Sequence, residues 1–226
     1  ARLAASGRYI VHFLDTNPDV VAKARVTLKA AKIYGMASAE RLTDPAHLPY
    51  TENLVNAVTI QESVKIPLSE VFRVLVPQGA VAASAKTGVK SSDLKSAGFV
   101  TITKTQNGGL HALKPWPENM DTWSHSRHGA SGNAVSGDTA VGPPERVRWV
   151  AAAMAEVEGL VSDGGRNFYG GVLARDSFNG LRLWHRDLMK GELNDSEFNL
   201  PKLSAARARP VVAGKYLFAI VRGKLA

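Results

Sequence analysis

The chain has 226 residues, 45% of them hydrophobic and 21% charged, which is typical of a folded globular protein and excludes wholesale disorder. Its 28 Lys and Arg against 20 Asp and Glu give a formal net charge of +8, but the excess is spread without a basic run, so nucleic-acid binding is not expected. The absence of cysteine excludes disulfides, thiolate metal sites and a cysteine nucleophile, and it suits the cytoplasm and the periplasm equally.

The first hundred residues alternate between strand-like and helix-like patterns. Tyr9–Asp15 is a short apolar run that ends on an acid, as buried parallel strands do. Asp15 and Pro18 then supply a capping residue and a first-turn proline for a helix over Val20–Ala31. Further strands are expected at Ala37–Arg41, Leu54–Ile60, Gly79–Ser84 and Val100–Thr103, and further helices at Leu68–Leu75 and just before Gly98. This alternation predicts a right-handed, mostly parallel α/β sheet.

The pattern changes after Leu113. Residues 114–144 are rich in Pro, Gly, Ser, Asn and Asp and show little periodicity. They predict an ordered connector rather than a flexible linker, because Trp116 and Trp123 are costly to leave unpacked.

From residue 145 to the end, the pattern predicts β strands alone. One strand is expected at Arg146–Ala151, two around the glycine turn of Leu160–Tyr169, and a hairpin over Leu173–Trp184. The pattern of the first pair, two short strands around a glycine turn, recurs at Pro210–Ala219. A repeat of about 50 residues with aromatic and glycine markers lies in the range of β-propeller blades.

The run Glu70-Val71-Phe72-Arg73-Val74-Leu75-Val76-Pro77-Gln78-Gly79 resembles the E-x-x-R-V-L-k-P-G-G segment of class I S-adenosylmethionine-dependent methyltransferases. In that family the segment spans a helix end, a Pro/Gly turn and the start of the next strand. The family's F-D-x-V element appears as Leu54–Val58, with Asn56 in place of Asp, and its L-x-x-A-G-F element appears as Leu94–Phe99. The resemblance implies a Rossmann-like, methyltransferase-like α/β module over residues 1–113.

The same resemblance implies S-adenosylmethionine as the cofactor. In the family an acidic residue at the end of the second strand hydrogen-bonds both ribose hydroxyls, and Asp15 stands at this place. Asp44 matches the Asp of the family's D-x-x-x-L-P-F element, which lies near the adenine amino group. Glu62 follows the strand Leu54–Ile60, at the carboxyl edge where such sheets bind ligands.

Each of these three acids has a simpler interpretation. Asp15 is also placed to cap the following helix, Asp44 to start an Asp-Pro turn, and Glu62 to be a solvated loop acid.

The resemblance fails at the loop that would hold the methionine part of the cofactor. The family's G-x-G-x-G loop should precede Asp15, where Gly7 stands alone, and its glycines let the cofactor approach the backbone. One glycine of the P-G-G turn is replaced by Gln78. The chain also lacks a Gly-x-x-x-x-Gly-Lys phosphate loop and a Gly-x-Ser-x-Gly elbow, so neither of these marks an alternative enzyme class.

Ala174–Trp184 resembles the end of a repeat of pyrroloquinoline-quinone-type β-propellers, and Pro210–Phe218 with Gly223–Ala226 resembles the start of the next. The resemblance implies that Trp184 packs between neighbouring blades and that Gly180 occupies a turn position that requires positive φ. Residues 145–226 are therefore expected to form partial repeats, about one and a half blades. Their open strands would pair with a partner chain or with further blades.

Trp123–His128 holds the densest group of polar and aromatic side chains outside these motifs. His125 and His128, three residues apart, could bind a metal together with Asp121 or Asp138. A connector held together by His and Trp hydrogen bonds is the favoured interpretation, and no metal is expected.

The sequence thus indicates a methyltransferase-like domain in a propeller-repeat protein, with methyl transfer to an unidentified acceptor if the domain is active. The alternative is a non-catalytic scaffold whose Rossmann and propeller strands serve assembly. A fragment of a quinone-dependent dehydrogenase is least favoured, because the quinone pocket would come from other blades. The chain has no run of about 18 apolar residues, so no membrane span is expected. The start at Ala1 suggests a processed or trimmed end of a larger bacterial protein.

Overall fold

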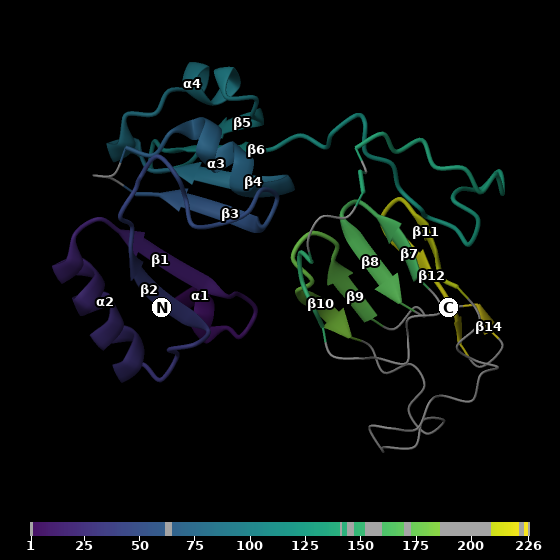
Figure 1. Ribbon diagram of the computed structural model, residues 1–226, viewed down its shortest axis with the longest axis horizontal. Helices are drawn as coiled ribbons and strands as arrows, with labels where there is room; N and C mark the ends of the chain where they lie inside the picture. The colour runs from purple at the N-terminus through teal and green to yellow at the C-terminus, as the bar shows by residue number, and fades with distance from the viewer. Residues whose placement is uncertain are drawn as a thin grey trace. The chain divides into compact units, whose positions relative to one another are not determined.

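The computed structural model describes residues 2–61, 65–140, 142–143, 147–151, 160–169, 173–185, 209–221 and 224–225. It consists of two compact units, residues 1–115 and residues 116–226. Figure 1 shows the helices of the first unit and the antiparallel strands of the second. No helix in the described part of the chain is long and apolar enough to span a membrane.

The first unit begins with a small parallel sheet. After the short helix α1 (Arg2–Ala5), strand β1 (Val11–Asp15) pairs in parallel with β2 (Ala37–Arg41). Helix α2 (Pro18–Ala30) connects the two strands, as the sequence predicts. Asn17, rather than Asp15, is its N-cap, and the Asn17 side chain accepts the Asp19 N–H.

A four-stranded sheet forms the rest of the first unit, in the order β3-β4-β6-β5. Its strands are β3 (Val55–Ile60), β4 (Leu75–Ala83), β5 (Val100–Lys104) and β6 (Leu110–Leu113). The helical segments between them are α3 (Leu68–Val74), the 3₁₀ turn η1 (Ala85–Thr87) and α4 (Ser91–Ser96). A core of aliphatic and aromatic residues from β3, β4, β6, α3 and α4 lies against this sheet.

The expected continuous, mostly parallel sheet is corrected in two respects. β1 and β2 form a sheet of their own, and β6 runs antiparallel to both β4 and β5. The tight β5–β6 connection explains the reversal: at Gly109 a Cβ would lie 2.5 Å from the Ala83 carbonyl oxygen, so only glycine fits there. β6 has four residues, too few for its alternation to be recognised in the sequence.

Side chains connect the two sheets of the first unit. Leu14 of β1 and Val58 of β3 pack against the same buried cluster of Leu42, Leu48 and Val74. The Tyr50 hydroxyl and His12 Nδ1 of β1 lie 2.7 Å apart in a hydrogen bond. Residues 42–50 therefore join β1–β2 to the larger sheet.

The second unit contains a four-stranded antiparallel meander in the order β10-β9-β8-β7. Its strands are β7 (Leu160–Asp163), β8 (Arg166–Tyr169), β9 (Leu173–Asp176) and β10 (Arg182–His185). Two hairpins follow, β11 (Val211–Ala213) with β12 (Tyr216–Phe218), and β13 (Ile220–Val221) with β14 (Lys224–Leu225). These strands confirm the antiparallel pattern, and no closed ring of sheets is present among the described residues.

Gly180 adopts the positive φ that the resemblance implies, whereas the packing of Trp184 between neighbouring blades stays a prediction. Trp184 packs against a cluster that joins Phe168 of the meander to Val212 of β11. Its ring lies 6.1 Å from that of Phe168. Gly180 has φ 72°, a conformation that disfavours residues with a Cβ.

The strand predicted at Arg146–Ala151 is wrong for its described part. Residues 147–151 are not in a strand, and Arg146 lies outside the described residues. Trp149 instead lies over the turn of the β9–β10 hairpin and donates its indole N–H to the Ser177 carbonyl at 3.1 Å. A Cβ on Gly180 would come within 2.4 Å of the Trp149 ring. Packing against this turn therefore overrides the strand-like sequence.

Candidate functional site

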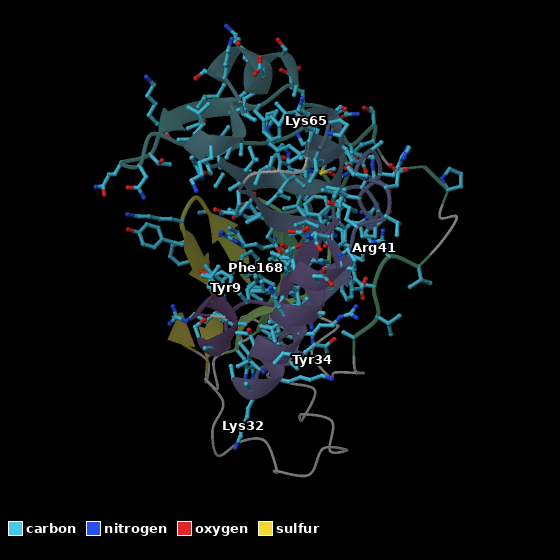
Figure 2. All side chains as sticks on the ribbon, turned by 90° about the vertical axis from the view of Figure 1, so that its left-hand side faces the viewer. Tyr9, Lys32, Tyr34, Arg41, Lys65 and Phe168 are labelled. Carbon is cyan, nitrogen blue, oxygen red and sulfur yellow. The ribbon has the colours of Figure 1, made fainter. Side chains whose placement is uncertain are left out.

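Asp15 ends β1 at the carboxyl edge of the small parallel sheet, where the chain turns into α2. Its Oδ1 accepts the Asn17 N–H at 2.8 Å, which fixes the carboxylate at the turn. This is the one side-chain hydrogen bond that the described part of the structure gives Asp15, so Oδ2 is available to a ligand hydroxyl. Arg41, labelled in Figure 2, ends the neighbouring strand and donates to the Thr16 carbonyl at 3.3 Å.

Asp44 lies in the loop that follows β2, and its own turn engages both carboxylate oxygens. Oδ1 accepts the Ala46 N–H at 2.9 Å, and Oδ2 lies 2.8 Å from His47 Nδ1. The hydrogen bond to His47, aided by that from Ala46, holds the pKa of Asp44 below its ordinary value. The structure therefore contains the Asp-Pro turn, and a ligand amino group would share or replace the contact with His47.

The Glu70–Arg73 pair positions this loop. The nearly buried Glu70 carboxylate accepts the Leu48 N–H at 2.9 Å and the Arg73 Nε–H at 2.9 Å. Arg73 Nη2 contacts Glu70 Oε1 and donates to the Tyr50 carbonyl at 2.9 Å. These hydrogen bonds, that from Arg73 above all, hold the pKa of Glu70 below its ordinary value despite its burial. The most recognisable motif of the chain thus holds the loop that carries Asp44.

Lys114 is a buried cation that sequence reasoning placed in the connector. Its ammonium donates to Asn53 Oδ1 at 2.7 Å and to the Phe72 and Leu75 carbonyls at 2.8 Å each. The Phe72 ring centroid lies 4.7 Å away. Burial lowers the pKa of Lys114 to about 8. All three donors are satisfied, so Lys114 closes the end of α3 against β4, and a lone Lys before Pro115 gives no sequence signal of that role.

Glu62 lies outside the described residues, so the structure does not place this third predicted ligand. Gly7, the one glycine ahead of Asp15, has φ 69° and nothing within 4 Å of a Cβ built on it. No close approach of another group requires glycine there. Of the predicted cofactor ligands, the structure thus places Asp15 and Asp44, and the described residues ahead of Asp15 contain no glycine-rich loop.

The histidine cluster of the second unit forms hydrogen bonds within the connector. Asp121 Oδ2 lies 2.7 Å from His128 Nε2 and accepts the Gly137 N–H at 2.6 Å, while Oδ1 accepts the Thr122 N–H at 2.7 Å. The backbone donors, with His128, lower the pKa of Asp121 to about 2. His125 Nδ1 is instead hydrogen-bonded to Ser124 Oγ, at 2.9 Å. In the part of the chain that the structure describes, no group of three or more His, Asp or Glu is placed to hold a metal.

No protein-family model matches this chain, and no curated protein matches it. Similar solved structures include the [4+2]-cyclase SpnF, 14% identical over 51% of this chain and 71% of that one, with a TM-score of 0.43. A S-adenosylmethionine-dependent methyltransferase from Methanosarcina mazei is 18% identical over 51% and 86%, with a TM-score of 0.36. The PH0226 protein from Pyrococcus horikoshii OT3 is 15% identical over 51% and 76%, with a TM-score of 0.40. These likenesses concern about half of the chain and are too distant to assign an activity.

Proposed function

We propose that residues 1–115 are a methyltransferase-like module that binds S-adenosylmethionine through its adenosine portion. Asp15 accepts hydrogen bonds from the ribose hydroxyls, and Asp44 lies near the adenine amino group. The observation that carries the proposal is the placement of Asp15 at the carboxyl end of β1, in a parallel β1–α2–β2 unit, with one oxygen fixed by Asn17 and the other available.

The donor chemistry agrees with this assignment. A carboxylate accepts from two vicinal hydroxyls at once, and the neighbouring Asn17 amide orients it. The Glu70–Arg73 pair keeps the Asp44 loop in place without a ligand, which limits the entropy lost on binding. The cofactor supplies the methyl group, and these residues serve to bind and orient it. The methyl acceptor is not identified by any residue described above.

Isothermal titration of the full chain with S-adenosylhomocysteine tests the proposal, because the product needs no acceptor. We expect saturable binding, weakened about tenfold or more in Asp15→Ala and less in Asp15→Asn, which keeps one hydrogen-bond acceptor. Asp19→Asn, in the first turn of α2, is the matched control and should bind as the parent does. Absence of binding by the parent chain, or equal affinity in Asp15→Ala, would overturn the ribose role.

The second candidate function is a non-catalytic scaffold that uses its strands for assembly. This function is favoured by the position of β1 and β3. Each is an edge strand of its sheet, although its sequence is typical of an interior strand. In this function the α/β unit is an architectural part, and the strands of either unit contact a partner chain.

A further inference from the structure

The hairpins β7–β8 and β11–β12 of the second unit are built alike. In each, a two-residue turn that contains glycine joins two strands that pair residue by residue. Counted from the turn, the third pair is Val161–Phe168 in the first hairpin and Val211–Phe218 in the second. Because directly paired residues of antiparallel strands point to the same face, each hairpin presents a Val–Phe pair on one face. The two faces can therefore be compared position by position.

The Val–Phe pair of the first hairpin is buried. Val161 is 0% exposed and Phe168, labelled in Figure 2, is 7% exposed. The pairing of the meander continues this row of side chains from Phe168 through Ala174 to Trp184, all on one face. The row Val161–Phe168–Ala174–Trp184 is thus an apolar stripe across all four strands of the meander.

The second hairpin covers this stripe. Val212 belongs to the same buried cluster as Val161 and Phe168, and Leu217 packs against that cluster. Val212 and Leu217 are the second pair of β11–β12 and point to the face opposite its Val–Phe pair. Val212 also donates its N–H to the Ser124 carbonyl at 2.9 Å, which holds β11 to the connector. The chain itself therefore shows which side chains cover a Val–Phe pair: the apolar second pair of another hairpin.

The Val–Phe pair of the second hairpin is exposed. Phe218 is 39% exposed, against 7% for its equivalent in the first hairpin, and Val211 is partly buried. Tyr216 points to the same face, is 58% exposed, and lies with its ring 6.3 Å from that of Phe218. Two large aromatic side chains thus stand side by side on a face that is covered at the equivalent positions of β7–β8. Such a patch is typical of a docking surface.

A second copy of the chain does not offer a matching hairpin at the two equivalent places. Its β11–β12 already uses Val212–Leu217 on its own meander. The second pair of its β7–β8 is Ser162–Asn167, and Asn167 Oδ1 accepts a hydrogen bond from the Ser177 hydroxyl at 2.8 Å. A polar outer face of this kind is typical of the terminal unit of a stack, so stacking begins at β7–β8 and is open beyond β11–β12.

We propose that the Val211–Phe218 face of β11–β12 binds a β-hairpin of a partner polypeptide whose second pair from the turn is apolar, as Val212–Leu217 is. The contact continues the interface that β11–β12 makes with the meander. Burial of the Phe218 ring supplies affinity, and the requirement for an apolar pair supplies selectivity. The proposal does not depend on cofactor binding by the first unit.

A cyclic peptide tests the docking face. The probe is residues 209–219 of this chain, joined head to tail to retain the hairpin, with a fluorophore on Lys215 and with Phe218→Ser so that probes do not stack on one another. Titration with the full chain is followed by fluorescence anisotropy. We expect saturable binding that Phe218→Ser in the full chain weakens at least tenfold, because a large apolar group is lost from the contact. Leu183→Ser removes a similarly exposed apolar side chain from β10 and is the matched control, which should bind as the parent does.

The selectivity is tested by a second probe with Val212→Ser and Leu217→Asn, which carries the polar pair of β7–β8 and should not bind. Hydrogen exchange of the parent chain should slow over residues 211–218 when the first probe is added, a result that does not depend on the folding of any variant. Absence of saturable binding, equal binding of the two probes, or equal losses in Phe218→Ser and Leu183→Ser would each overturn the proposal. A stable dimer in sedimentation that Phe218→Ser dissociates would overturn the choice of partner and show that a second copy occupies the face.

Discussion

The two units of this protein hold their loops in place by opposite means. In residues 1–115, buried side chains reach across the sequence: Lys114 bonds Asn53, 61 residues away, and Arg73 bonds the Tyr50 carbonyl. In the connector of the second unit, the half-buried Asp121 gathers donors no further along the chain than Gly137. Loss of a buried tie leaves several polar groups without partners, whereas water can replace a partner at the surface. The first unit should therefore be the more sensitive to single polar substitutions.

Lys114→Met should have the largest effect, lowering the free energy of unfolding by about 3 kcal/mol. Methionine keeps the apolar stem but leaves the Phe72 and Leu75 carbonyls without their donor. Urea unfolding followed by circular dichroism measures the change. Lys104→Met, at the exposed end of β5, is the control and should shift stability by less than about 0.5 kcal/mol. A similar, small effect of both substitutions would remove the contrast between the units.

Gly180→Ala tests the most demanding backbone position of the second unit. The new Cβ would lie 2.4 Å from the Trp149 ring, and the alanine backbone would have to adopt φ 72°. We expect a loss of about 2 kcal/mol in unfolding free energy. The tryptophan fluorescence of the folded variant should also differ from that of the parent, because Trp149 is displaced. Gly214→Ala has a similar positive φ but nothing within 4 Å, so it isolates the conformational part of the cost. Equal losses at both glycines would mean that Trp149 does not pack as described.

Gln78→Gly should stabilise the first unit by about 1 kcal/mol, because Gln78 adopts φ 64°, a conformation that glycine takes without steric cost. The gain should appear as a rise in the urea midpoint with an unchanged slope. Gln106→Gly, where φ is not positive, should give no such gain. A lower midpoint for Gln78→Gly would indicate that the Gln78 side chain contributes more than its strain costs.

Asp121→Asn should change pH dependence more than stability at neutral pH. The pKa of Asp121 is lowered to about 2 in the folded chain, so the ionised group contributes stability above its ordinary pKa of 3.8 and loses that contribution as the pH falls from about 4 to 2. The substitution should flatten the fall of Tm over that window. Asp163→Asn in β7 is the control. An unchanged profile for Asp121→Asn would contradict the role of Asp121 in the connector.

The sequence predicted local elements well and long-range pairing poorly. β2 was predicted with its observed bounds, and α2, β3 and the hairpins of the meander within a few residues, because capping residues, glycine turns and apolar runs are local signals. The separation of β1–β2 from the larger sheet was not predicted, since nothing within a strand specifies its neighbours.

Part of the candidate site could likewise be read from motifs, and part could not. Asp15 was placed at the end of a strand by its position after an apolar run, and Glu70 and Arg73 were recognised by spacing. Their task of holding Leu48 and Tyr50 was not visible, because it depends on a contact more than twenty residues away. The partners of Lys114 were missed for the same reason.

The position of Lys114 also constrains how this chain folds as it is synthesised. The ribosome releases α3 and β4 well before the residue whose ammonium holds them together, and that residue comes just before the last position of the first unit. A nascent chain that ends short of Lys114 therefore carries the Phe72 and Leu75 carbonyls without their donor. The first unit can complete its native set of contacts only when synthesis has reached the connector, so native structure should appear late and abruptly during translation of this unit.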